Sequence, residues 1–156
     1  MATGRIRDKL TGTKYPDEGV GPLPHREVRA ALLALNGPDV PYRVRDATPA
    51  ERADLVAECA VRRVSVRLRT RMRLIPDEQE VRFLHERWEN RPSDNARAQY
   101  GRGHAPAVYR QWETERGPDG TRRRVEAFRF DTREMTGPLQ NAVLGAGWTW
   151  RGVFKL

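Results

Sequence analysis

The sequence predicts an α+β fold in one domain: an antiparallel, largely meandering sheet of about four to six strands, packed by an N-terminal and a C-terminal helix. Three observations lead to this prediction. Residues 64–74 alternate between apolar side chains and arginines, as a strand with one buried face does. Turn-forming residues separate that stretch from a second apolar stretch of similar length. Segments with helical spacing lie on either side, and 156 residues suit a single domain.

The alternating stretch begins a predicted β-hairpin that ends near Glu89. Pro76-Asp77-Glu78-Gln79 supplies the turn, because proline fixes φ at a position where turns require it. If Ile75 lies opposite Glu80, one face of the hairpin is apolar and the other is rich in charge. This register predicts a set of cross-strand pairs: Leu74 with Val81, Met72 with Phe83, Arg69 with Glu86, and Arg67 with Trp88.

Before the hairpin, residues 1–23 have no hydrophobic period, and we expect a flexible basic N-terminal arm preceding a domain of residues 24–156. Residues 24–35 have apolar side chains at helical spacing, begin with proline and end at Asn36-Gly37-Pro38, so they predict a helix. Residues 40–46 alternate and predict a strand. Residues 48–61 leave two alternatives open: a capped helix, or a capped turn that gives way to a strand.

In the second half, residues 91–106 have no period and predict a loop. Residues 108–115 and 121–130 predict two strands joined by the turn Gly117-Pro118-Asp119-Gly120. Thr136-Gly137-Pro138 is expected to open a short helix that ends at Gly145 and Gly147. The chain then finishes with a short strand or extended segment in which Trp148 and Trp150 share a face.

Composition limits the function. The net charge is +8, and of 29 basic residues only three are lysine, which favours contact with nucleic acid or another anionic partner. We expect no membrane association, because no apolar run approaches the roughly 20 residues that a membrane helix needs. The lone Cys59 excludes an intramolecular disulfide, so the cytoplasm is the expected location. The spacing of His, Cys, Asp and Glu predicts no metal site, and no cofactor-binding motif is present.

The C-terminal run EAFRFDTREMTGPLQNAVLGAGWTWRGVFKL resembles the ending of a family of small uncharacterised proteins of actinobacteria. Those chains end in a PLQ helix and a GWTWRG stretch. The segments PYRVRDATPAERADLVAE and RMRLIPDEQEVRFLHERWE are also similar to that family. The chain departs from the family in a shorter segment before RMRL and in Cys59, where the family has tryptophan. The resemblance favours a strand for residues 54–61 and implies no activity or catalytic residue.

The alternating arginines are the first candidate for a binding surface. They could follow a phosphate backbone, with Trp88 as a stacking surface. The alternative is a solvated sheet face that the acidic second strand of the hairpin neutralises, since residues 76–90 hold five acids and two arginines. The residues of this candidate nucleic-acid or anion site are Arg67, Arg69, Arg71, Arg73 and Trp88.

The tryptophans are the second candidate. Most of the aromatic side chains are expected in the core, but Trp112, Trp148 and Trp150 could instead line a ligand pocket or a partner groove. The leading functional hypothesis is a non-catalytic module that binds a protein or a small ligand. A nucleic-acid-binding protein using the arginine-rich face is the first alternative, and an enzyme without an identifiable catalytic set is the second. The oligomeric state and the identity of the partner stay open.

Overall fold

A computed structural model describes residues 2–89 and 99–156, and it has the predicted α+β fold. The main sheet has six strands in the order β1-β2-β3-β4-β5, with β8 beside β4. The strands β1 to β5 follow one another along the chain and are antiparallel, so this part of the sheet is a meander. Its strands are β1 (Arg43–Asp46), β2 (Leu55–Val61), β3 (Val66–Ile75), β4 (Glu80–Glu89), β5 (Gln99–Arg102) and β8 (Thr149–Gly152).

The β3–β4 hairpin has the predicted register, with Ile75 opposite Glu80. Strand β3 buries every second residue from Val66 to Leu74, and its arginines lie on the other face. The turn is a short 3-10 helix, η3 (Pro76–Glu78), that ends at Gln79 with a φ of 50°. All four predicted pairs are confirmed: Leu74 with Val81, Met72 with Phe83, Arg69 with Glu86, and Arg67 with Trp88.

The two open alternatives for residues 48–61 are settled in favour of a capped turn followed by a strand. Thr48 and Glu51 form a capping box around the 3-10 helix η1 (Pro49–Glu51), and β2 begins at Leu55. The predicted helix at residues 24–35 is α2 (His25–Leu33). The predicted strand at residues 40–46 is confirmed as β1, although it begins only at Arg43.

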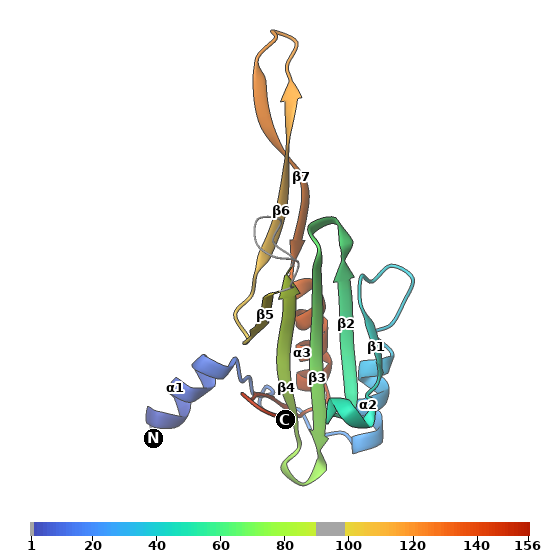
Figure 1. Cartoon of the computed structure of the whole chain (residues 1–156). Helices are drawn as coiled ribbons and strands as arrows, with labels where there is room; N and C mark the ends of the chain where they lie inside the picture. The colour runs from blue at the N-terminus through green and yellow to red at the C-terminus, as the bar shows by residue number, and fades with distance from the viewer. Residues whose placement is uncertain (1, 90–98) are drawn as a thin grey trace.

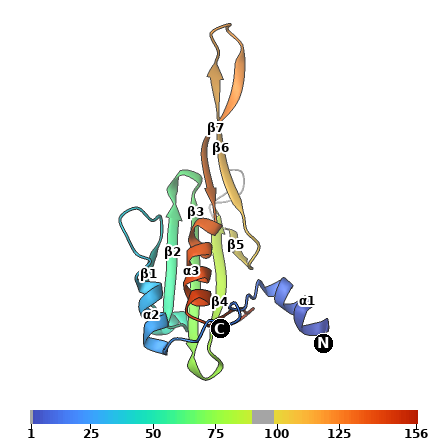
Figure 2. The ribbon, with the colours of Figure 1, turned by 180° about the vertical axis from the view of Figure 1, so that it is seen from behind.

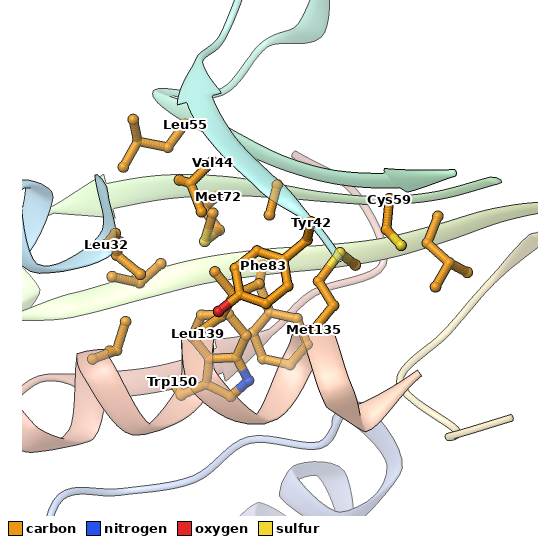
Figure 3. Packing of buried hydrophobic residues seen from close by; sticks show 14 of the residues in the cluster. Leu32, Tyr42, Val44, Leu55, Cys59, Met72, Phe83, Met135, Leu139 and Trp150 are labelled. Carbon is orange, nitrogen blue, oxygen red and sulfur yellow. The ribbon is translucent and has the colours of Figure 1, made fainter. Parts of the chain in front are cut away.

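Helix α2 and helix α3 (Arg133–Gly145) supply the apolar cover for one face of the sheet. Figure 2 shows α3 lying along this face, with α2 beside β1. The core between them contains Leu32 from α2, Met72 and Phe83 from the hairpin, and Met135 and Leu139 from α3 (Figure 3). The opposite face of the sheet, which carries the arginines of β3, is turned toward the viewer in Figure 1. We call it the outer face.

Three expectations for regular structure are corrected. Residues 1–23 were expected to lack it, but α1 (Ala2–Thr11) is a helix and Lys14 forms a β-bridge with Trp150. Residues 99–102 were expected in a loop, but they pair with the end of β4; residues 91–98 of that predicted loop lie outside the described residues. The C-terminal helix begins at Arg133, so Pro138 lies inside it instead of opening it.

Strand β8 is the predicted C-terminal strand, but it lies parallel to β4 in an otherwise antiparallel sheet. The free edge of β4 is therefore shared by two partners: Glu80–Phe83 pairs with β8, and Glu86–Glu89 pairs with β5. Gly152 lets the N-terminal segment approach β8, because a Cβ at this position would overlap the backbone carbonyl of Thr11.

The predicted hairpin of the second half is confirmed as β6 (Val108–Arg116) and β7 (Arg122–Asp131), but it forms a separate two-stranded sheet. Figure 1 shows this ribbon projecting beyond the end of the main sheet. Its base is attached to the rest of the protein, because Phe130 is buried in the core and the Tyr109 hydroxyl donates to Glu89 at 2.7 Å. Among the described helices, none is long and apolar enough to cross a membrane.

Candidate functional site

The outer face gathers the arginine side chains that the sequence singled out. Residues directly opposite each other in an antiparallel pair lie on the same face, so the β3 arginines share this face with side chains of four neighbouring strands. None of the described α-helices lies over it (Figure 1), and the 3-10 helix η1 contacts it through Glu51. From β3 it carries Arg67, Arg69, Arg71 and Arg73, from β4 Glu86 and Trp88, from β5 Tyr100 and Arg102, and from β1 and β2 Arg45 and Glu58.

Arg69 and Arg71 are held by a buried carboxylate. Glu86 has a side chain only 3% exposed, and its Oε1 accepts from Arg71 Nε at 2.7 Å and from Arg69 Nε at 3.2 Å. Its other oxygen accepts from the Tyr100 hydroxyl at 2.5 Å. Burial by itself would raise the pKa of Glu86, but the hydrogen bonds from Tyr100 and Arg71 and the charge of Arg69 outweigh it, so the pKa is lowered. Glu86 is therefore an anion at neutral pH.

Glu51 of η1 is a second carboxylate that holds arginines of the outer face. Arg45 donates to both of its oxygens, at 2.8 and 2.9 Å, and Arg69 lies 3.5 Å away. The hydrogen bonds from Arg45 lower the pKa of Glu51 to about 2, helped by its bond from the Thr48 backbone. Arg71 also donates to the Glu51 carbonyl at 2.9 Å. Arg69 and Arg71 are therefore structural parts of a charged network.

Arg67 and Arg73 have a different environment. Both are exposed, and within residues 2–89 and 99–156 neither forms an ion pair with a carboxylate. The Arg67 guanidinium lies 4.5 Å from the centre of the Trp88 ring, as predicted from the register, and Arg73 donates to the carbonyl of Arg52 at 3.3 Å. The four arginines of β3 thus divide into two that are neutralised and two that keep their charge available.

Trp88 and Tyr100 form an aromatic pair beside Arg67. Their ring centroids lie 5.3 Å apart on adjacent strands, and the planes are inclined by 49°. Tyr100 is 45% exposed, while Trp88 is half-buried. Arg102 lies over the Tyr100 ring at 5.4 Å and hydrogen-bonds to its hydroxyl. The described part of the outer face thus presents two adjacent aromatic rings, with Arg67 and Arg69 over Trp88 and Arg102 over Tyr100.

The structure does not bring the other candidate tryptophans together. Trp148 and Trp150 are 2% and 1% exposed, so the hypothesis that they line a ligand pocket or partner groove is wrong for both. Trp150 stacks on Phe83 at 4.1 Å, and the Trp148 indole donates to the Leu23 carbonyl at 2.8 Å. Both rings are core side chains, as large apolar groups near α3 should be. Trp112 is 45% exposed, but it lies on the β6–β7 ribbon.

Two hollows beside His85 are small, whereas a more open one of about 820 Å³ lies between α1, β4 and the C-terminal segment. One of about 60 Å³ lies between β4, the segment after β5 and the first turn of α3, and another of about 100 Å³ lies toward the C-terminus. His85 borders both and hydrogen-bonds through Nδ1 to the Thr70 hydroxyl at 2.7 Å. Burial, with a contribution from His104, lowers the pKa of His85 to about 3. The two small hollows hold a few water molecules and leave no room for a drug-sized ligand.

Burial raises the pKa of the Cys59 thiol to about 11, with a contribution from Glu134, so the thiolate is scarce at neutral pH. Among the described residues, no group of three or more His, Cys, Asp and Glu side chains could hold a metal ion.

Tyr100 and Glu51 are among the residues that contribute to the outer face but were not found from the sequence. Tyr100 lies in the short strand β5, in a segment that the sequence placed in a loop. Glu51 reaches the arginine rows from a turn that the capping-box spacing did reveal, although the spacing gives no direction for its side chain. The segment around Tyr100, between Gln99 and two glycines, is too short to indicate a strand.

Comparison with known proteins adds no relative: no family model matches the sequence, and no match was found among curated proteins or solved structures. The resemblance to the actinobacterial family therefore stays a prediction.

Proposed function

We propose that this protein is a non-catalytic binding module that holds single-stranded nucleic acid on its outer face. The observation that carries the proposal is the Trp88–Tyr100 pair on the outer face, which none of the described α-helices covers, with Arg67 and Arg102 beside it. Single strands are bound in this way by sheet-based modules, because bases stack on exposed aromatic rings while cations contact the phosphates.

The charged network supports the proposal because it holds the side chains of the outer face in place. Glu86 holds Tyr100 through its hydroxyl and Arg69 and Arg71 through their guanidinium groups. Side chains that are already ordered lose less conformational entropy when a partner binds. The aromatic pair would therefore meet a base with little rearrangement.

The distribution of charge supports it as well. Arg67 and Arg73 lie about 20 Å apart along β3, since they are separated by six residues at roughly 3.3 Å each. Arg43 of β1 is also exposed, and no ion pair involves it within residues 2–89 and 99–156. These cations could follow the phosphates of a short strand while Trp88 and Tyr100 contact its bases.

The proposal is tested by fluorescence-anisotropy titration with a labelled single-stranded oligonucleotide at low and at physiological salt. Tyr100→Ala removes a stacking ring and should weaken binding about five- to 150-fold, because base–aromatic stacking contributes roughly 1–3 kcal/mol per base. Arg67→Gln should lower the salt slope by about 0.7, the value for one phosphate contact to a single strand.

Tyr100→Phe is the matched control. It keeps the ring but removes the hydrogen bond to Glu86. We expect Tyr100→Phe to bind nearly as well as the original protein. Equal losses in the Phe and Ala variants would mean that the hydroxyl, and not stacking, is responsible. Absence of binding even at low salt would reject the proposal.

A protein partner is the second candidate, and exposed apolar side chains favour it. Leu10 of α1 is 64% exposed, Phe154 near the C-terminus is 67% exposed, and both border the cavity of about 100 Å³. Apolar patches of this kind are typical of association sites. Light scattering of the pure protein tests it: self-association that Leu10→Ser abolishes would favour this candidate.

The proposal includes a cytoplasmic location, which the single, buried Cys59 supports. Membership of the actinobacterial family is likewise a proposal, supported by the PLQ and GWTWRG segments.

A further inference from the structure

The β6–β7 ribbon has two faces of different composition. Strand pairing places Tyr109, Gln111, Phe128 and Phe130 on one face. This face is attached to the sheet, because Arg63 donates to Gln111 at 2.8 Å and lies over the Phe128 ring at 5.3 Å. The other face points away from these contacts and is exposed along its length. We call it the basic face, and it carries Arg110, Trp112, Thr114, Arg116, Arg122, Arg124, Glu126 and Arg129.

A β-bulge keeps the arginines of both strands on the basic face. Gln111 is opposite Phe128, but Trp112 is opposite Glu126, so Ala127 is an extra residue in β7. Without this extra residue, β7 would present Arg123, Val125 and Ala127 on the basic face in place of Arg122, Arg124 and Glu126. The bulge therefore aligns the arginines on either side of it.

The arginines of the basic face keep their charge available. The five arginines share this surface with Glu126 and Asp131, and Asp131 forms an ion pair with Arg133 at 2.6 Å. Within the described ranges, no ion pair involves Arg110, Arg116, Arg122, Arg124 or Arg129. The Arg124 guanidinium lies 5.4 Å from the centre of the exposed Trp112 ring. The opposite face instead pairs its charges, as between Arg123 and Glu115 at 3.9 Å.

We propose that the basic face of this ribbon binds double-stranded DNA, with the ribbon lying in the major groove. The major groove of B-form DNA, about 12 Å wide, admits a two-stranded β-ribbon. At roughly 3.3 Å per residue, the strands of nine and ten residues extend about 30 Å, close to one helical turn. The projection of the ribbon from the sheet leaves it free to enter a groove (Figure 1).

This surface differs from the outer face in position and in ligand. The outer face offers a stacking pair for unpaired bases, whereas the ribbon offers arginines around a single exposed tryptophan. The major groove of duplex RNA is deep and too narrow for side chains to read. A ribbon that enters a groove should therefore distinguish DNA from RNA duplexes, which adsorption by charge alone does not.

The test is an anisotropy titration of the whole chain with a 20-base-pair DNA duplex and with an RNA duplex of the same sequence. The triple variant Arg110→Gln, Arg124→Gln and Arg129→Gln should lower the salt slope for duplex DNA by about 2.7, the value for three lost phosphate contacts. It should leave the weaker binding of duplex RNA unchanged. Arg5→Gln, Arg7→Gln and Arg26→Gln form the control triple, which removes the same charge from exposed positions on α1 and α2.

The melting temperature of each variant verifies that it is folded. Trp112→Ala, a single change at an exposed position, is a second variant, and it should weaken DNA binding. Equal losses in the two triples, equal affinity for both duplexes, or dimerisation through the ribbon would overturn the proposal. Tyr100→Ala must leave duplex DNA binding unchanged, so failure of the outer-face proposal and failure of the ribbon proposal give different results.

Discussion

Glu86 gives the sharpest test of the view that Arg69 and Arg71 are structural. Replacing it with alanine removes the carboxylate that accepts from Arg71 at 2.7 Å, from Arg69 at 3.2 Å and from Tyr100 at 2.5 Å. The Arg71 side chain is only 12% exposed, so its charge would lose its carboxylate partner in a largely buried position. Breaking a buried ion pair from one side costs roughly 3–5 kcal/mol.

The expected loss lies at the lower end of that range, about 3 kcal/mol. Arg71 retains the Glu51 carbonyl at 2.9 Å, and Arg69 retains the Glu51 carboxylate at 3.5 Å. Urea unfolding followed by circular dichroism measures the free energy directly. For a chain of this size, the melting temperature should fall by about 6–12 °C.

Glu115→Ala is the matched control, because Glu115 is 59% exposed and lies 3.9 Å from Arg123. An exposed ion pair of this length contributes about 0–1 kcal/mol. If Glu86→Ala lost less than about 1 kcal/mol, like a surface pair, the network would not hold the arginines and the reasoning would be refuted.

Two further predictions concern stability. Gly152→Ala should lower the free energy of unfolding by about 3 kcal/mol and expose the N-terminal segment to proteolysis, because the new methyl group meets the Thr11 carbonyl. Gly145→Ala is the control: nothing lies near its Cβ, so it should be neutral or stabilising in a thermal melt. Neutral His85, whose folded pKa of about 3 lies below its unfolded value, contributes stability that is complete above pH 6.5 and is lost as the pH falls toward 3. A series of melts from pH 7 to 4 should show this loss in the original protein and a flatter profile in His85→Gln; identical profiles would contradict it.

The β3–β4 hairpin was predictable to the level of residue pairs. Alternating polarity specified the faces, and the proline turn specified the register, because a slip of one residue would have placed arginines in the core. The capping box at Thr48 likewise located η1. These signals are local, so the sequence alone carries them.

The features that were missed depend on partners distant in the sequence or have weak or misleading local signals, and for β8 the missed feature is its pairing with β4. Strand β8 pairs with β4 across more than sixty residues, and its parallel direction follows from where α3 returns the chain. Helix α1 has only two large apolar residues, Ile6 and Leu10, and this stripe is too short to indicate a helix from the sequence. Helix α3 begins five residues before Pro138, and the rule that proline opens helices placed its start too late.

The candidate site likewise has parts that a local pattern predicts and parts that depend on residues distant in the sequence. Arg67 and Trp88 were predicted as a pair because they face each other in the hairpin. The separation of Arg69 and Arg71 from Arg67 and Arg73 depends on Glu51, which approaches from another turn. Burial of Trp148 and Trp150 depends on how α3 and β8 pack, which composition does not reveal.

The most direct measurement of the central claim is photo-crosslinking of a single-stranded oligonucleotide to the protein, followed by identification of the crosslinked peptide by mass spectrometry. If bases stack on the outer face, the crosslinks will lie at Trp88 and Tyr100, and Tyr100→Ala will remove the second of them. Crosslinks confined to other surfaces, or none at a concentration where anisotropy shows binding, would contradict the account.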